Sequence, residues 1–147
     1  MPGDYRNIYK NARAVADITQ EAAAERLCIS VESVRAYETG QRIPPNHVVS
    51  RMVTVYNTQW LAVQHVNLHD ELAASIIPMI QPRTRMEAAI RFANRVNRFI
   101  KKHSLDRLLE ITEDNQVDHE EKEDYNEIVE AMGDLAQSYL ELRFCDE

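Results

Sequence analysis

The stretch from Thr19 to Gly40 constrains the fold of this chain more than any other. It contains two short helix-compatible segments, and each follows a residue that commonly caps a helix, Thr19 for the first and Ser30 for the second. Cys28 and Ile29 alone separate the first segment from the second cap. Gly40 readily takes the left-handed conformation that ends a helix. The pattern predicts two short helices joined by a tight turn.

This stretch and its flanks resemble the Cro/cI-like (XRE) family of helix-turn-helix DNA-binding proteins over roughly residues 5–62. Two positions depart from the family pattern, because Cys28 stands at the usual turn glycine and Ala23 at a usual leucine. The resemblance implies an all-α fold, with a five-helix helix-turn-helix domain over residues 1–62 followed by a helical C-terminal hairpin or bundle. The matching residues are Arg13, Thr19, Gln20, Ala24, Leu27, Ile29, Ser30, Val34, Tyr37, Glu38, Thr39, Gly40 and Pro44.

The resemblance also implies which residues meet DNA. The family places the second helix of the motif, here 31–39, in the major groove. Glu32 leaves two interpretations open, since it either accepts from a cytosine amino group or repels phosphate. Arg13 and Glu38 are implied to form a structural ion pair and not to read bases. The predicted DNA-binding residues are Gln20, Val31, Glu32, Ser33, Arg35, Ala36, Thr39, Gln41 and Arg42.

Beyond the motif the pattern remains helical. A helix is expected over 59–77, and Pro78 and Pro82 then mark a break. We therefore interpret residues 63–82 as a connecting helix and linker, and residues 83–147 as a helical interaction or dimerisation domain.

Two long helices are expected in the C-terminal part, over 84–103 and 119–143, with a short helix near 105–112 between them. Apolar residues recur at spacings of three and four in both long helices, a pattern typical of a packed hairpin or a dimer seam. The residues of the two seams are Met86, Ile90, Ala93, Val96 and Ile100, and Tyr125, Ile128, Met132, Leu135, Tyr139 and Leu142.

Charge is distributed unevenly along the chain, whose formal net charge is −7. Residues 1–58 carry seven basic and six acidic side chains, so the acidity does not exclude DNA binding by the front part. Residues 83–107 hold eight basic against two acidic side chains, and residues 110–147 hold two against fourteen. We expect the basic and the acidic helix to pack antiparallel, with their oppositely charged flanks side by side.

No cofactor or metal site is predicted, and an enzyme is the weakest interpretation, because no nucleophile–base pair, P-loop or metal triad can be assembled. His65 and His69 have a metal-compatible spacing but lack a third ligand. Residues 110–121 faintly resemble a calcium-binding EF-hand loop, although Asn115 stands where a glycine is needed. A turn before an acidic helix start is the simpler explanation.

Neither a membrane-spanning run nor an apolar signal segment is recognised, so we expect a cytoplasmic protein without a membrane partner. The leading hypothesis is a sequence-specific double-stranded DNA-binding regulator of transcription, expected to be a repressor and a homodimer, of the kind that bacteria and prophages encode. The alternative is a protein-interaction module, such as an antitoxin or assembly partner, that binds a protein through residues 83–147 and their acidic helices.

Overall fold

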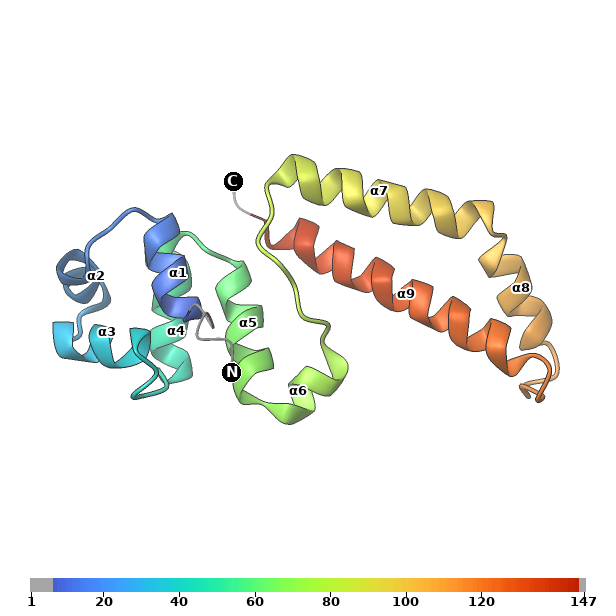
Figure 1. The fold of residues 1–147 in the computed structure, drawn as a ribbon, viewed down its shortest axis with the longest axis horizontal. Coiled ribbons are helices and arrows are strands. Elements are labelled where there is room, and N and C mark those ends of the chain that lie inside the picture. The colour runs from blue at the N-terminus through green and yellow to red at the C-terminus, as the bar shows by residue number, and fades with distance from the viewer. Residues whose placement is uncertain (1–6, 146–147) are drawn as a thin grey trace. The chain divides into compact units, whose positions relative to one another are not determined.

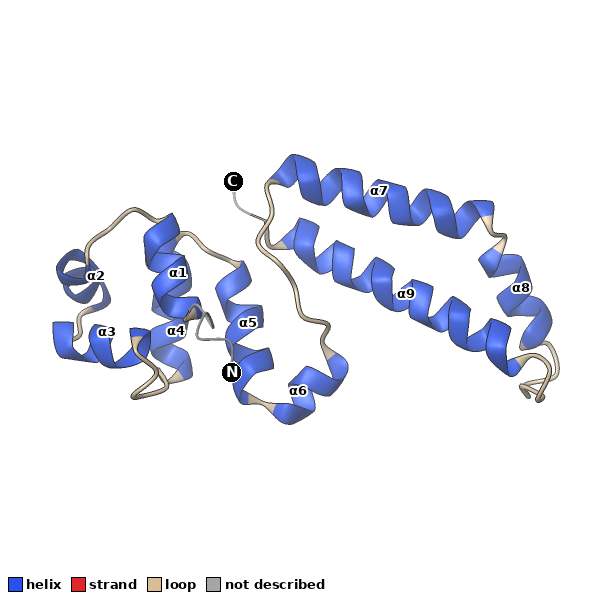
Figure 2. Ribbon diagram, in the orientation of Figure 1, coloured by secondary structure: helices blue, strands red, loops and turns tan. Residues whose placement is uncertain are grey.

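The computed structural model describes residues 7–145, and over this range it consists of α-helices joined by loops (Figure 1, Figure 2). The chain divides after Pro82 into two compact units. The first unit contains residues 7–82 and 144–145, and the second contains residues 83–143. The predicted all-α fold is confirmed.

The first unit is a bundle of short helices around an apolar core. Side chains from different helices are removed from solvent together, among them Leu27, Val34, Met52 and Leu61. Ile80, in the segment that follows the last helix, is also fully buried. The helices are α1 (Ile8–Val15), α2 (Gln20–Leu27), α3 (Val31–Glu38), α4 (Asn46–Tyr56), α5 (Trp60–His69) and α6 (Glu71–Ile76).

The single helix expected over 59–77 is wrong, because α5 and α6 are separate helices. Asp70 between them has an extended backbone (φ −130°, ψ 106°), and its carboxylate accepts a hydrogen bond from the Ala73 amide at 3.0 Å. By capping α6, the Asp70 side chain favours the start of a new helix over continuation of α5. The spacing of apolar residues does not reveal this effect.

The second unit is an antiparallel hairpin of two long helices, α7 (Arg85–Lys101) and α9 (Lys122–Arg143), joined through α8 (Ser104–Ile111) (Figure 1). Thr84 and Glu87 form a capping box that starts α7. Phe99, Ile111 and Ile128, one from each helix, form its buried apolar cluster.

Charged and polar groups fill much of the contact between α7 and α9. The Glu141 carboxylate, fully buried, lies 2.9 Å from Nε of Arg83 and 3.0 Å from Nε of Arg91. Arg95 lies 3.7 Å from the Asp134 carboxylate, and Lys102 lies 2.6 Å from that of Glu127. The predicted antiparallel packing of the basic on the acidic helix is confirmed.

The apolar seam predicted on α7 does not pack within the hairpin, and its use between two copies stays a prediction. Met86, Ile90 and Ile100 are exposed to solvent, whereas Ala88 and Phe99 are buried on the opposite side of the helix. The helix therefore carries two apolar stripes, and the one with the large Phe99 ring also brings the arginines to the acidic groups of α9.

The predicted seam of α9 is only partly packed. Ile128 is buried and Leu135 is half-buried against the apolar cluster, but Met132 and Tyr139 are exposed. Ser138 and Glu141 are buried instead: Arg95 of α7 donates to the Ser138 hydroxyl, and Arg91 of α7 pairs with Glu141. The buried face of α9 therefore differs from the predicted one. Polar contacts between the helices help to set this face, and a pattern of apolar residues does not reveal them.

Candidate nucleic-acid interface

The helix-turn-helix geometry follows from local capping. The Thr19 hydroxyl accepts from the Ala22 amide, and the Ser30 hydroxyl accepts from the Ser33 amide, each at 3.1 Å. Cys28 ends α2 in the left-handed conformation (φ 55°), where glycine is favoured, and its side chain is exposed. Three residues thus reverse the chain and fix the angle at which α3 follows α2 (Figure 1).

One side of α3 is anchored in the core and the other is open. Val34, Tyr37 and Glu38 are buried. The predicted DNA-binding residues lie on α3, on the loop after it and, for Gln20, at the start of α2. Of these, Glu32, Arg35, Thr39, Gln41 and Arg42 are exposed, and Gln20, Val31, Ser33 and Ala36 are half-buried. The open side of α3 and the following loop therefore present these residues together.

Arg13 and Glu38 form an ion pair beneath α3. Arg13 donates from Nε to one oxygen of the Glu38 carboxylate and from Nη2 to the other at 2.9 Å. Only 3% of the Glu38 side chain and 14% of the Arg13 side chain are exposed. The hydrogen bond to Glu38 raises the pKa of Arg13, and Nη1 of Arg13 donates to the Ile18 carbonyl at 2.7 Å. The pair fastens α3 to α1 (Ile8–Val15).

Gln20 connects this buried pair to the open side of α3. Its Nε2 donates to Glu38 at 2.8 Å, and its Oε1 accepts from Nε of Arg35 at 3.3 Å. A carboxylate of Glu21 lies 3.9 Å from the Arg35 guanidinium. Both ends of the Gln20 amide are engaged, so this residue positions Arg35 as well as facing outward. Spacing alone does not reveal such a bridge, because its members come from three helices.

Arg42 returns from the loop onto α3. Its Nη2 donates to the Ser33 hydroxyl at 2.7 Å, and its guanidinium lies 5.4 Å from the centroid of the Tyr37 ring. The Thr39 hydroxyl donates to the Arg35 carbonyl at 2.8 Å and so closes the helix end. Gly40 follows with φ 76°, which suits a glycine. Arg35 and Arg42 are both exposed, and Arg42 is held against α3 by Ser33 and Tyr37.

A buried hydrogen-bond chain fixes α1 against α5 behind the interface. Nε2 of His65 lies 3.0 Å from the Asn46 Oδ1, an acceptor, so this nitrogen carries the proton. The other ring nitrogen then accepts from the Tyr9 hydroxyl at 2.7 Å, and His69 Nε2 donates to that hydroxyl at 2.9 Å. Burial lowers the pKa of both histidines, with the nearby His69 contributing at His65, and burial raises the pKa of Tyr9.

His65 and His69 thus have a structural role, and Asn46 is part of the same hydrogen-bond chain. No cluster of three or more metal-binding side chains occurs within residues 7–145. In the loop before α9, the Asp114 carboxylate accepts from the Gln116 amide, and that of Asp118 accepts from Glu120 and Glu121. These acidic groups satisfy the turn itself.

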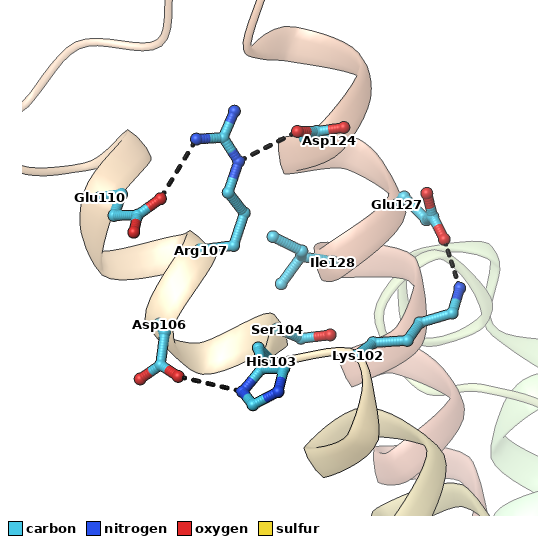
Figure 3. A pocket seen from close by; sticks show the side chains of 9 residues that line it. All are labelled: Lys102, His103, Ser104, Asp106, Arg107, Glu110, Asp124, Glu127 and Ile128. Carbon is cyan, nitrogen blue, oxygen red and sulfur yellow. Dashed lines mark hydrogen bonds and ion pairs between the residues drawn. The ribbon is translucent and has the colours of Figure 1, made fainter.

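A hollow of about 520 Å³ lies between α8 and α9 (Figure 3). Its charged side chains are paired with each other: Arg107 bonds to Asp124 at 3.0 Å and to Glu110 at 3.3 Å, and Lys102 pairs with Glu127. The two carboxylates raise the pKa of Arg107 through hydrogen bonds. The bond between Arg107 and Asp124 holds α8 on α9.

Comparison with known families supports the assignment of a helix-turn-helix within the first unit. Residues 10–64, a little over a third of the chain, match a family model described as a helix-turn-helix domain. No curated protein and no solved structure shows a significant match to the chain. Within the described residues no helix is both long and apolar enough to cross a membrane.

Proposed function

Because residues 10–64 form a helix-turn-helix domain of the Cro/cI type, we propose that the protein is a sequence-specific regulator of transcription that binds double-stranded DNA. It binds as a homodimer, with α3 of each copy in the major groove, and it represses by occupying its site. It acts by binding and not by catalysis, in the manner of the small regulators of bacteria and their prophages.

The observation that carries the proposal is the chain of contacts from Arg13 through Glu38 and Gln20 to Arg35. A side chain that reads a base must be held in place before it binds, since ordering it on binding costs free energy. Arg35 is held from beneath by a bridge that ends in a buried ion pair. An ordinary surface arginine has no need of such support.

The open side of α3 also has the chemistry that base readout requires. A guanidinium donates to both acceptors of guanine in the major groove, so Arg35 is suited to a G·C pair. Glu32, one turn earlier on α3, is suited to the amino group of a cytosine. Arg42 and Gln41 follow on the loop and are suited to the phosphates that set the position of α3.

A dimer follows from the small size of this surface. One short helix contacts few base pairs, and two copies spaced one turn of DNA apart multiply both affinity and selectivity. We therefore expect a site with two related halves about 10 base pairs apart.

The direct experiment is selection of binding sites from random double-stranded DNA with the full chain. The selected site is then titrated at a fixed salt concentration with the wild type, Arg35→Ala and Arg85→Ala. Arg85 is exposed on α7 and provides a matched loss of charge outside the interface. Arg35→Ala should weaken specific binding by about 1–3 kcal/mol, whereas Arg85→Ala should bind like the wild type.

Failure to enrich any sequence would contradict the proposal. Equal affinity of Arg35→Ala and the wild type for the selected site would remove α3 from its reading role. The affinity of Gln20→Ala for the selected site should lie between those of the wild type and Arg35→Ala. This substitution frees the Arg35 side chain without removing it.

A further inference from the structure

The outer side of α7, which faces away from α9, carries an apolar stripe that no described residue covers. It consists of Met86, Ile90, Ala93, Asn97 and Ile100, all of them exposed. Met86 is 74% exposed, Ile90 53% and Ile100 60%. We call these five residues the outer stripe. Large apolar side chains that line one helix face mark a contact surface more often than scattered ones do.

The spacing of the outer stripe is that of a coiled-coil seam. Successive members are four, three, four and three residues apart, so they alternate between the a and d positions of a heptad. Ile90 and Asn97 fall at a, and Met86, Ala93 and Ile100 fall at d. A polar residue such as Asn97 at an a position commonly restricts which helix pairings form.

The second unit also has little apolar material of its own. Only three large side chains of its apolar cluster, Phe99, Ile111 and Ile128, are buried, and the apolar residues packed against them are only partly buried. Charged groups fill much of the rest of its main helix contact. A helical unit of this size ordinarily needs more buried apolar area to be stable. A partner on the outer stripe would supply it.

We propose that the outer stripe is the surface through which two copies of this chain pair, with their α7 helices antiparallel. This inference deepens the proposed function, and rests on it for the dimer, by naming the surface that joins the copies. In the antiparallel register, Ile90 of one copy packs against Ile100 of the second copy, and Ala93 packs against Asn97.

Charge complementarity selects a second copy, and this direction of pairing. Glu87 and Lys101 flank the outer stripe at its two ends, and both are exposed. Antiparallel pairing places Glu87 of each copy beside Lys101 of the second copy, which gives two ion pairs related by the two-fold axis. The capping box uses Oε2 of Glu87, which leaves Oε1 to pair with Lys101 of the second copy. A parallel pair would set like charges in the same layer and form neither contact.

Sedimentation equilibrium of the full chain without DNA tests the inference. The wild type should be a dimer, and Ile90→Asp/Ile100→Asp should raise the dimer dissociation constant by a factor on the order of 100 or more, because dimerisation would bury charge. Both residues are exposed within one chain, so the variant should keep the helix content of the wild type. Met132→Asp, at an exposed apolar residue of α9, is the matched control and should remain a dimer.

Two further variants test the charges. Lys101→Glu should raise the dissociation constant about tenfold, since two attractive contacts become repulsive. Arg98→Glu makes the same charge change on a different side of α7 and should alter the constant less than twofold. An equal effect of the two variants would overturn the antiparallel register.

Cross-linking gives the direction independently. In a Cys28→Ser/Cys145→Ser background, a mixture of Ile90→Cys and Ile100→Cys chains should form the mixed disulfide faster than either variant forms a disulfide with itself. Rapid self-linking of both variants would overturn the antiparallel pairing in favour of a parallel one.

The outcomes separate the inference from the proposed function. A monomeric wild type, or an undiminished dimer in Ile90→Asp/Ile100→Asp, overturns the inference even if DNA is bound specifically. Loss of dimerisation in that variant, from a wild type that enriches no DNA sequence, supports the inference and contradicts the proposed function.

Discussion

The two units of the chain bury their side chains by different means. In the first unit the fully buried large side chains are mainly apolar, as Leu27, Met52 and Leu61 illustrate, and the Arg13–Glu38 pair lies at the edge of that core. In the second unit the buried Glu141 and the arginines of α7 occupy much of the main helix contact.

This difference teaches how each unit obtains its stability. Burial of apolar side chains stabilises the fold without requiring a partner of particular geometry. In a buried ion pair, the cost of desolvating the two charges cancels most of their attraction. The first unit is therefore expected to be stable by itself, and the second to gain from a partner on its outer stripe. Four predictions test this difference between the units, and the first has the largest expected effect.

Leu27→Ala should lower the free energy of unfolding of the first unit by about 3–4 kcal/mol, because the site is fully buried and leaves a cavity. Ile90→Ala, on the exposed stripe of the second unit, should cost less than about 0.5 kcal/mol at protein concentrations too low for pairing. Urea unfolding followed by Trp60 fluorescence reports the first unit, and far-UV circular dichroism reports both. Equal losses would contradict the comparison.

Glu38→Ala should destabilise the first unit by about 2–3 kcal/mol, because it leaves the Arg13 charge without its partner. The loss stays below that of a fully buried pair, since Arg13 is partly exposed and keeps its bond to the Ile18 carbonyl. In a double-mutant cycle, Arg13→Ala/Glu38→Ala should lose less free energy of unfolding than the sum of the losses in the two single variants. Strict additivity would show that the pair is not coupled.

Acidification should weaken the first unit. The pKa values of His65 and His69 lie below 6.5 in the folded chain, so the unfolded chain binds protons more readily. The stability contribution is complete above about pH 6.5 and is lost as the pH falls through the folded pKa values. Melting followed by Trp60 fluorescence should show a fall in Tm over this range.

His65→Gln should reduce that fall, because one of the two titrating rings is removed. An unchanged pH dependence in His65→Gln would show that the buried chain from Asn46 to Tyr9 is not its source.

The smallest expected effect concerns the salt dependence of DNA binding. Arg42→Gln should reduce the slope of log affinity against log salt by about 1, as expected for one lost phosphate contact. Arg98→Gln, at an exposed arginine of the basic helix, should leave the slope unchanged. A reduced slope in Arg98→Gln would place the second unit on DNA and remove this contrast between the units.

The sequence by itself determined the elements whose causes are local. Thr19 and Ser30 cap the two helices of the motif within one turn of themselves, and the short segment between them leaves little choice of geometry. The opposite charges of the two C-terminal helices likewise predicted that these helices pack together, because charge blocks are visible without knowledge of contacts.

The tertiary structure alone decided which atoms meet. Helix α7 has two apolar stripes, and periodicity identified the one that faces outward. The contact of α7 with Glu141 of α9 distinguishes the two stripes, and the sequence does not show this contact. The bridge through Gln20 to Arg35, and the bond from His65 to Asn46, join residues distant in sequence. Helix caps act over a single turn and leave a trace in the sequence. Hydrogen bonds between helices depend on how those helices are rotated and spaced, which the packing of the whole unit fixes.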